Sequence, residues 1–328
     1  MNEYDLLIVG AGPAGLTAGI YAARYKLKAL IIGTVVGGLI TEAHKVCNFP
    51  SIKEISGMEL TQKMKDHVLS LGIKIKEDEV ESIKKEDDLF RVGTQSGQKF
   101  FTKTLLLAFG TRHRRLNLPN EEKFLGRGVS YCSTCDGPFF RDKIVGVVGG
   151  SDAAVMAALF LSEIAQKVFV IYRKGKLRAI PIWVEELEKR KNVETVFNTN
   201  VIGLLGKEKL EKVRLDKPYQ GSEYLQVDGL FLEVGTVPSQ ALSQQLGVET
   251  DENGFIKVDQ SGKTNVRGVW AAGDITTGSD GFMQIITACA EGAVGARDIY
   301  KYLSTKETAV KTNKKKLFRF RPFSKQKM

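Results

Sequence analysis

Residues 6–15 read LLIVGAGPAG and decide the fold of this chain. The four apolar residues predict a buried strand, the glycines a tight turn, and the alanine-rich stretch after them a helix that ends near Tyr25. Gly10 permits the turn, Gly12 lets a pyrophosphate approach the backbone, and Gly15 permits close packing of helix on strand. Because the first N–H groups of such a helix are unpaired, the stretch predicts a dinucleotide site. An acid often follows about 20 residues later to bind the ribose, but residues 29–41 contain none.

The same pattern occurs a second time. A strand at Ile144–Val148 runs into residues 149–154, which read GGSDAA, then into a helix to about Ala165 and a strand at Val168–Tyr172. The first copy likewise ends in a strand, at Ala29–Ile32. Two βαβ units of about 30 residues predict an α/β protein with two doubly wound nucleotide-binding domains. We expect the second domain (116–244) to be inserted into the first (1–115 and 245–305).

Charge is distributed unevenly along the 328 residues. The net charge is +10, but residues 306–328 contain nine Lys or Arg and one acid, Glu307. The remainder is therefore near neutral, which argues against a nucleic-acid-binding surface on the folded body. We expect residues 306–328 to be a disordered basic tail. No apolar run approaches the roughly 18 residues of a membrane span, and no signal peptide is visible, so we expect a cytoplasmic protein without a transmembrane segment.

Cys132 and Cys135 form the one cysteine pair with meaningful spacing, Cys-x-x-Cys, and Asp136 follows them. Two thiols in one turn can close and reopen a disulfide, with one sulfur attacking a partner and the other resolving the mixed disulfide. Asp136 could carry the proton that this chemistry needs. Half of a zinc site is the other reading, but Cys47, Cys289 and the three histidines are isolated in sequence, so we expect no metal. Cys47 and Cys289 are expected to be small buried hydrophobic residues.

The second glycine turn is the weaker fingerprint, because Ser151 stands where the second glycine admits a pyrophosphate. Its next strand leads into Arg173, Lys174 and Arg178, at the position where cations accommodate the 2′-phosphate of NADP. A solvated basic loop is the alternative. The context favours NADPH.

The sequence resembles the low-molecular-weight thioredoxin reductases from residue 1 to about 303. The segments that carry the resemblance are Gly10–Gly15, Gly37-Gly38, Asn48-Phe49-Pro50, Tyr131–Gly137, Arg173-Lys174, Arg178, Gly273-Asp274, Gln284 and Thr287-Ala288. Cys132–Gly137, just before the second nucleotide unit, is the most diagnostic of them.

The resemblance implies a homodimer that passes electrons from NADPH through FAD to a Cys132–Cys135 disulfide and then to thioredoxin or a similar small redox protein. Cys135 would face the flavin, Cys132 would exchange with thioredoxin, Asp136 would be the acid/base and Asp274 would bind the ribityl chain. One domain would rotate against the other between half-reactions. The residues expected to bind FAD are Gly10, Gly12, Pro13, Ala14, Gly15, Gly33, Gly37, Gly38, Asn48, Gly110, Asp274 and Gln284. Those expected to bind NADPH are Gly149, Ser151, Ala154, Arg173, Lys174 and Arg178.

Several positions depart from the family pattern, among them Val35, Leu39, Phe109, Ser151, Lys174 and Met283. They leave two alternatives open on the same scaffold: electrons from ferredoxin, or a dithiol oxidase that uses oxygen. A different class of function, in which the basic aromatic tail recruits the protein to RNA or to an anionic membrane, is the remaining alternative. A weak contact of the tail with anionic surfaces is compatible with the reductase, whereas specific nucleic-acid binding is not expected.

Overall fold

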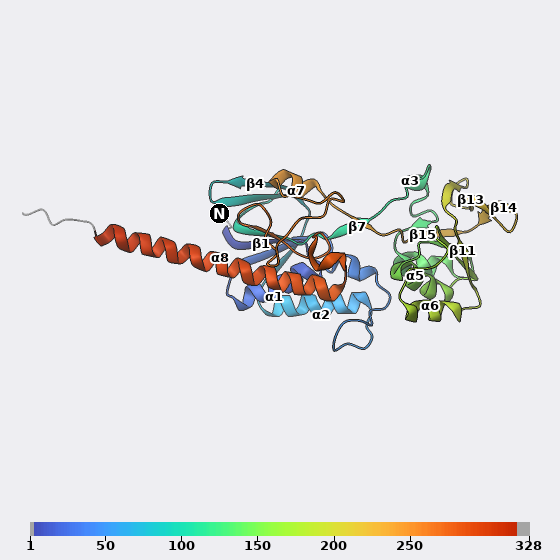
Figure 1. Cartoon of the computed structure of the whole chain (residues 1–328), viewed down its shortest axis with the longest axis horizontal. Helices are drawn as coiled ribbons and strands as arrows, with labels where there is room; N and C mark the ends of the chain where they lie inside the picture. Colours follow the sequence, from blue (N-terminus) through green and yellow to red (C-terminus); the bar gives the residue numbers. More distant parts are fainter. Residues whose placement is uncertain (1–2, 320–328) are drawn as a thin grey trace, which may run out of the picture. The chain divides into compact units, whose positions relative to one another are not determined.

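The computed structural model describes the backbone of residues 3–319 and the side chains of residues 3–305 (Figure 1). The chain divides into two compact units. Unit 1 takes its described residues from Met1–Thr41, Cys47–Thr111 and Pro238–Met328, and unit 2 consists of Glu42–Val46 and Arg112–Val237. Two of the segments that cross between the units, β7 (Thr111–His113) and β16 (Thr236–Pro238), pair with each other as a two-stranded sheet.

Unit 1 is an α/β unit built on a seven-stranded sheet. Its elements in chain order are β1 (Glu3–Val9), α1 (Pro13–Arg24), β2 (Ala29–Gly33), η1 (Gly38–Glu42, whose last residue belongs to unit 2), α2 (Gly57–Ser70), β3 (Lys74–Glu77), β4 (Val80–Glu86), β5 (Leu89–Thr94), β6 (Lys99–Leu107), α7 (Ala241–Leu246), β17 (Val269–Ala271), η3 (Gly278–Gly281) and α8 (Ile285–Arg319). The sheet order is β3-β2-β1-β6-β5-β4, and β17 pairs in parallel with the end of β6.

The core of unit 1 lies on both faces of β1. Leu6 and Ile8 pack with α1 and α8 on one face, while Leu7 and Val9 face the opposite cluster. A central parallel strand buried on both faces needs such a continuous apolar run. Figure 1 shows α8 alongside α1, and these two helices pack extensively on each other.

Unit 2 has a five-stranded parallel sheet in the order β11-β10-β9-β15-β8 and a small antiparallel sheet, β12-β13-β14. Its elements are α3 (Glu121–Phe124), β8 (Val129–Ser130), α4 (Ser133–Asp136), η2 (Gly137–Phe140), β9 (Ile144–Val148), α5 (Asp152–Ser162), β10 (Lys167–Tyr172), α6 (Pro181–Glu188), β11 (Val193–Phe197), β12 (Val201–Leu205), β13 (Lys212–Tyr219), β14 (Ser222–Gln226) and β15 (Gly229–Leu232). Both predicted βαβ units are therefore present, one in each unit of the chain.

The end of the chain differs from the irregular tail that the sequence led us to expect. α8 continues to Arg319, well past residue 306. The physical reason is that residues 296–321 contain neither glycine nor proline, so nothing in the sequence stops the helix before Pro322. Residues 320–328, which include most of the aromatic part of the predicted tail, lie outside the described residues. Within the part of the chain that is described, no helix is long and apolar enough to cross a membrane.

Candidate functional site

The first glycine turn joins β1 to α1 and leaves room for a ligand at only one of its glycines. A Cβ at Gly10 (φ +114°) would lie 2.1 Å from the carbonyl oxygen of Ala108, and one at Gly15 would lie 2.0 Å from that of Gly10. A Cβ at Gly12 would meet nothing nearer than 4.0 Å. Gly12 is also the N-cap of α1, and no side chain caps the helix there. Open space beside unpaired helical N–H groups fits the phosphates of a dinucleotide.

The other predicted flavin residues of unit 1 gather around this turn. The N–H of Gly37 donates to the carbonyl of Ala11 (2.8 Å). A Cβ at Gly38 would lie 3.7 Å from the Cα of Gly12, and one at Gly33 would lie 2.7 Å from the nitrogen of Ala11. Pro13 is the first residue of α1, a position where a proline's missing N–H costs nothing. The strand-end loops thus close on the N-terminus of α1.

A second group of predicted residues meets from distant parts of the sequence. Asn48 Nδ2 donates to Gln284 Oε1 (2.9 Å) across 236 residues. Gly273 lies against Ala14, because a Cβ added to it would be 3.0 Å from the Ala14 Cβ. Gly110 follows β6 with a left-handed backbone (φ +60°), and none of the contacts described here links it to the others.

Asp274 lines a shallow hollow on unit 1, together with Gly273, Phe282, Met283 and Glu291. Burial raises the pKa of Asp274 to about 6, and the Glu291 carboxylate adds to the rise. A half-buried carboxylate that faces a hollow is an acceptor for a ligand hydroxyl. These residues therefore fit a flavin dinucleotide.

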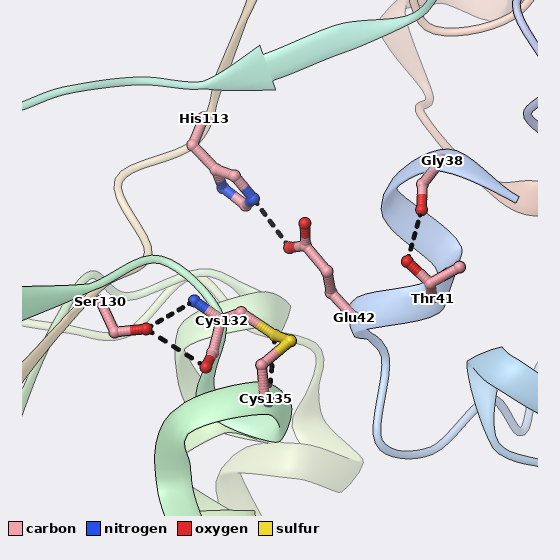
Figure 2. A network of polar contacts seen from close by, with 7 residues as sticks. All are labelled: Gly38, Thr41, Glu42, His113, Ser130, Cys132 and Cys135. Atoms are coloured by element: carbon pink, nitrogen blue, oxygen red, sulfur yellow. Dashed lines mark hydrogen bonds and ion pairs between the residues drawn. A yellow bond between two sulfur atoms is a disulfide. The ribbon is translucent and has the colours of Figure 1, made fainter. Parts of the chain in front are cut away.

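The cysteine pair lies in unit 2 as a disulfide at the start of α4 (Figure 2). Ser130 Oγ accepts from the N–H of Cys132 (3.0 Å) and donates to its carbonyl (3.3 Å). Cys132 is the N-cap of α4, and its Sγ accepts from the N–H of Cys135 (3.1 Å). Cys135 is exposed and Cys132 is half-buried. The N–H of Asp136 donates to the Cys132 carbonyl (3.1 Å), so the acid is held within the same turn.

α5 separates the cysteine turn from the second glycine turn. The residue after Asp136, Gly137, packs on Phe160 and Leu161 near the end of α5, whereas Ser151 is the N-cap at its start. At 1.5 Å per residue, the 11 residues of α5 place the two turns at opposite ends of a helix about 16 Å long.

The second glycine turn brings its predicted residues together in part. Ser151 caps α5 without a side-chain hydrogen bond, and Ala154 is fully buried. The N–H of Arg178 donates to the carbonyl of Gly150 (2.8 Å), which fixes the basic loop beside the turn. Arg173, Lys174 and Arg178 are exposed, and no carboxylate among the described residues forms an ion pair with them. Their cations are available to a phosphate.

Unit 2, which contains the cysteines, also contains a charged cluster that no sequence pattern indicated. Glu42 forms an ion pair with His113 (2.7 Å, Figure 2), and the ring of His113 stacks on Tyr131 (5.5 Å between centroids). The hydrogen bond to Glu42 raises the pKa of His113. Burial raises the pKa of Glu233 to about 7, which His113 opposes and Glu42 reinforces. This cluster could not be predicted from the sequence, because its members lie up to 191 residues apart and belong to no sequence motif.

The two remaining cysteines differ from each other. Cys289 is buried, as predicted, but Cys47 is exposed, so that prediction was wrong. Cys47 lies in the connection after η1, where its neighbour Asn48 is also exposed. No group of three or more metal-binding side chains occurs among the described residues.

Comparison with known proteins gives consistent matches over nearly the whole chain. Residues 4–292 match the family model of the pyridine nucleotide-disulphide oxidoreductases. The chain is 38% identical to the thioredoxin reductase of Treponema pallidum, over 93% of this chain and 98% of the relative. Among solved structures, the Lactococcus lactis thioredoxin reductase is 35% identical with a TM-score of 0.87, and that of T. acidophilum is 36% identical with a TM-score of 0.86. Each alignment covers 92% of this chain and 99% of the other.

Proposed function

This chain belongs to the pyridine nucleotide-disulphide oxidoreductase family, and we propose that it is a thioredoxin reductase that passes electrons from NADPH through FAD and the Cys132–Cys135 disulfide to thioredoxin. The observation that carries the proposal is the position of the disulfide. It lies in a turn immediately before β9, the first strand of the second nucleotide unit, and rests on the helix of that unit. Relatives named thioredoxin reductase align with the chain over this whole region.

The FAD would be held by the residues around the first glycine turn. The N–H groups at the start of α1 would bind its pyrophosphate, the open side of Gly12 would admit it, and Asp274 would accept a ribityl hydroxyl. When bound, FAD supplies a two-electron carrier between a nicotinamide and a disulfide. Gly12, Asn48 and Gln284 would help to orient it.

Reduction of the Cys132–Cys135 disulfide by two electrons breaks the S–S bond, and uptake of two protons leaves two thiol groups. The N–H of Cys135, which points at Cys132 Sγ, favours the thiolate at Cys132. That thiolate attacks one sulfur of the thioredoxin disulfide and releases the other sulfur as a thiolate, which takes a proton. Cys135 then attacks Cys132 Sγ, which restores the enzyme disulfide and releases the second thioredoxin sulfur as a thiol. Asp136 would carry the protons in this exchange.

NADPH would bind at the second glycine turn, with its 2′-phosphate on Arg173, Lys174 and Arg178. Ser151 favours another donor such as ferredoxin, because its side chain stands where a second glycine usually lies against the pyrophosphate. Ser151 also leaves the dithiol oxidase as a candidate, because that enzyme would not need a site for NADPH.

One anaerobic experiment tests the proposal. Purified protein is mixed first with NADPH and separately with NADH, and bleaching of the flavin absorbance is followed. Oxidised thioredoxin is then added and its new thiols are counted. We expect fast bleaching with NADPH and two thiols per NADPH consumed. Fast bleaching without new thiols would refute the reductase, and no bleaching with either nucleotide would refute NADPH as the donor.

We propose further that the enzyme works as a homodimer in the cytoplasm and that the basic residues after 305 make a weak contact with anionic surfaces. Nine cations in 23 residues support the contact, since each contributes roughly 1 kcal/mol near anionic lipid. Sedimentation of the holoenzyme tests the dimer, and retention on vesicles of anionic lipid in rising salt tests the tail. A monomer at micromolar concentration, or retention that salt does not alter, would contradict these two proposals.

A further inference from the structure

One carboxylate of α8 organises the loop that follows β17. Glu291 Oε2 accepts from the N–H of Gly273 (2.8 Å) and lies 3.0 Å from Thr276 Oγ1, while Glu291 Oε1 accepts from Ser279 Oγ (2.6 Å). Thr276 Oγ1 in turn accepts from the N–H of Gly278 (3.0 Å). Both ends of the loop are thus tied to a single side chain. Hydrogen bonds to a charged acceptor are about twice as strong as neutral ones.

The loop adopts a backbone that it would not hold unaided. Ser279 and Asp280 both have φ +52°, in the left-handed region that non-glycine residues avoid. A Cβ at Gly278 would lie 2.6 Å from Glu291 Oε1, so the backbone there approaches the carboxylate as closely as a glycine allows. Strained residues of this kind persist where surrounding contacts fix them, and here the contact is the bond from Ser279 to Glu291.

Asp274 belongs to the same loop and faces the hollow that the loop forms with α8. No hydrogen bond to its carboxylate occurs among the described residues. Burial raises its pKa to about 6 with a contribution from Glu291, which is the charged side chain of α8 that acts on it. Asp280, on the same loop, is exposed and does not contribute to that shift. The carboxylate that holds the loop therefore also opposes the ionisation of Asp274.

We propose that Glu291 is a positioning residue for the flavin: it holds the Gly273–Gly281 loop in shape and places its own carboxylate at the hollow that Asp274 lines. The inference rests on the proposed flavin site and adds to it a residue whose role is to hold the loop. An ionised Asp274 accepts a ribityl hydroxyl better than a protonated one, so flavin retention should weaken as the pH falls through the range in which Asp274 titrates. Removing the Glu291 charge should move that range to lower pH.

The test measures FAD release from diluted holoenzyme between pH 5 and 8.5, by the rise in free-flavin fluorescence, for the wild type, Glu291→Gln and Glu291→Ala. Glu291→Gln keeps the shape and an acceptor oxygen but not the charge, so its release profile should shift to lower pH with little change at pH 8. Glu291→Ala also loses the ties to the loop and should bind FAD about tenfold more weakly at pH 8.

Asp298→Asn is the matched control. Asp298 is a carboxylate on the same helix that accepts from Trp270 Nε1 (3.1 Å) and pairs with Lys263 (2.9 Å), away from the loop. We expect it to leave the pH profile of FAD release unchanged. A wild-type profile in Glu291→Gln, or wild-type affinity in Glu291→Ala, would overturn the inference while leaving the reductase proposal intact. A wild-type protein that binds no FAD at any pH would overturn both.

Discussion

The two glycine turns have the same plan but differ at two of their three key positions. The first position is glycine in both, Gly10 and Gly149, and in both a Cβ would lie within 2.3 Å of a carbonyl oxygen of the neighbouring strand's end. The third is Gly15 in unit 1 and the buried Ala154 in unit 2. The second is Gly12 in unit 1, where the protein leaves a Cβ unobstructed, and Ser151 in unit 2.

The difference separates what the fold requires from what the ligand requires. The glycine at the first position is needed in both turns because the sheet leaves no room for a side chain. The residue allowed at the third position depends on how closely the helix approaches its strand. At the second position of unit 1 no protein atom would crowd a side chain, so a glycine there serves a bound molecule. Under the proposed function, unit 1 would admit a pyrophosphate closely, whereas unit 2 would admit it with less space.

The largest expected effect is on the half-reaction that the cysteines of unit 2 carry out. Cys132→Ser and Cys135→Ser should each lower thioredoxin reduction at least about a thousandfold, because exchange needs both sulfurs. Reduction of flavin by the donor should continue at near the wild-type rate, since the cysteines take no part in it. Stopped-flow absorbance measures the first half-reaction and thiol release the second. Cys47→Ser, at an exposed cysteine outside the pair, is the control, and near-normal turnover in either active-site variant would disprove the assignment.

The ligand role of the second glycine can be tested by placing a serine in unit 1. Gly12→Ser should weaken FAD binding about a hundredfold, because the side chain takes the place of phosphate contacts worth roughly 1.5–3 kcal/mol. It should change the unfolding free energy by less than about 0.5 kcal/mol, since a Cβ meets open space there. Flavin titration and urea unfolding of the apoprotein measure the two quantities.

Gly15→Ala provides the contrast for that experiment. Its Cβ would lie 2.0 Å from the carbonyl oxygen of Gly10, so we expect a loss of about 2 kcal/mol of stability or more. If Gly12→Ser lowered stability as much as Gly15→Ala, the distinction between fold and ligand positions would fail.

In unit 2 the basic loop should determine which nucleotide is used. Arg173→Ala combined with Arg178→Ala should raise the KM for NADPH on the order of a hundredfold, because each arginine gives a charge-assisted bond of roughly 1.5–3 kcal/mol to the 2′-phosphate. The KM for NADH should change little, since NADH lacks that phosphate. Steady-state kinetics with both nucleotides measure this, with the neighbouring exposed Lys176→Ala as the control. Equal changes for both nucleotides would show that the two arginines do not bind the 2′-phosphate.

A smaller effect should appear in the pH dependence of the unfolding free energy of unit 2. Glu233 has a pKa raised from 4.5 to about 7, so ionising it costs stability, and that cost grows as the pH rises from about 4.5 to 7. His113 has a raised pKa, so its stabilisation is present at low pH and is lost as the pH rises through that value. The Glu233 shift should lower the unfolding free energy of unit 2 by about 1–3 kcal/mol between pH 4.5 and 7. Loss of the His113 contribution should continue the decline at higher pH.

Urea unfolding followed by Trp183, in a Trp270→Phe background, measures this change in unit 2. Glu233→Gln should flatten the pH dependence, whereas Glu188→Gln, at an exposed glutamate of the same unit, should not. A wild-type slope in Glu233→Gln would assign the pH dependence to other groups.

The smallest expected effect is at the end of the chain. Among the residues of α8 whose side chains are described, which end at Thr305, Leu303 is the last that is buried in the core of unit 1. A chain ending at Thr305 should therefore keep thioredoxin turnover within about twofold of the wild type, while losing salt-sensitive retention on anionic vesicles. Loss of turnover in a truncated protein that still binds FAD would place the tail within the enzyme.

Much of the fold could be predicted because its signals are local. The strands and helices at both glycine turns follow from short apolar runs with glycine between them. The spacing of Cys132 and Cys135, together with the isolation of the other cysteines and the histidines in sequence, indicated the redox pair. The pairing of β17 with β6 and the bond between Asn48 and Gln284 join residues more than 160 positions apart, and no local pattern encodes such contacts.

The missed residues share one property: each acts through a partner from a different segment. Glu291 is an ordinary helical glutamate until the loop after β17 folds onto it, and Glu42 gains its role only beside His113. Cys47 was expected to be buried from its residue type, but its exposure depends on a connection whose path the sequence does not specify. Side chains of this kind become visible only when the tertiary structure is known.

Unit 2 interrupts unit 1 in the sequence, so unit 1 begins to be synthesised first but is completed last. Residues 112–237 form most of unit 2 and emerge as one stretch, so this unit can fold while the chain is still being made. Unit 1 must wait for β17 and α8, which supply the last strand beside β6 and the helix that packs on α1. At about 5–20 residues per second, the roughly 66 residues from Val237 to Leu303 take about 3–13 s to be made. During that interval the nascent protein carries a finished cysteine turn but no finished flavin pocket, so its thiols would meet the cell's oxidants before the cofactor arrives.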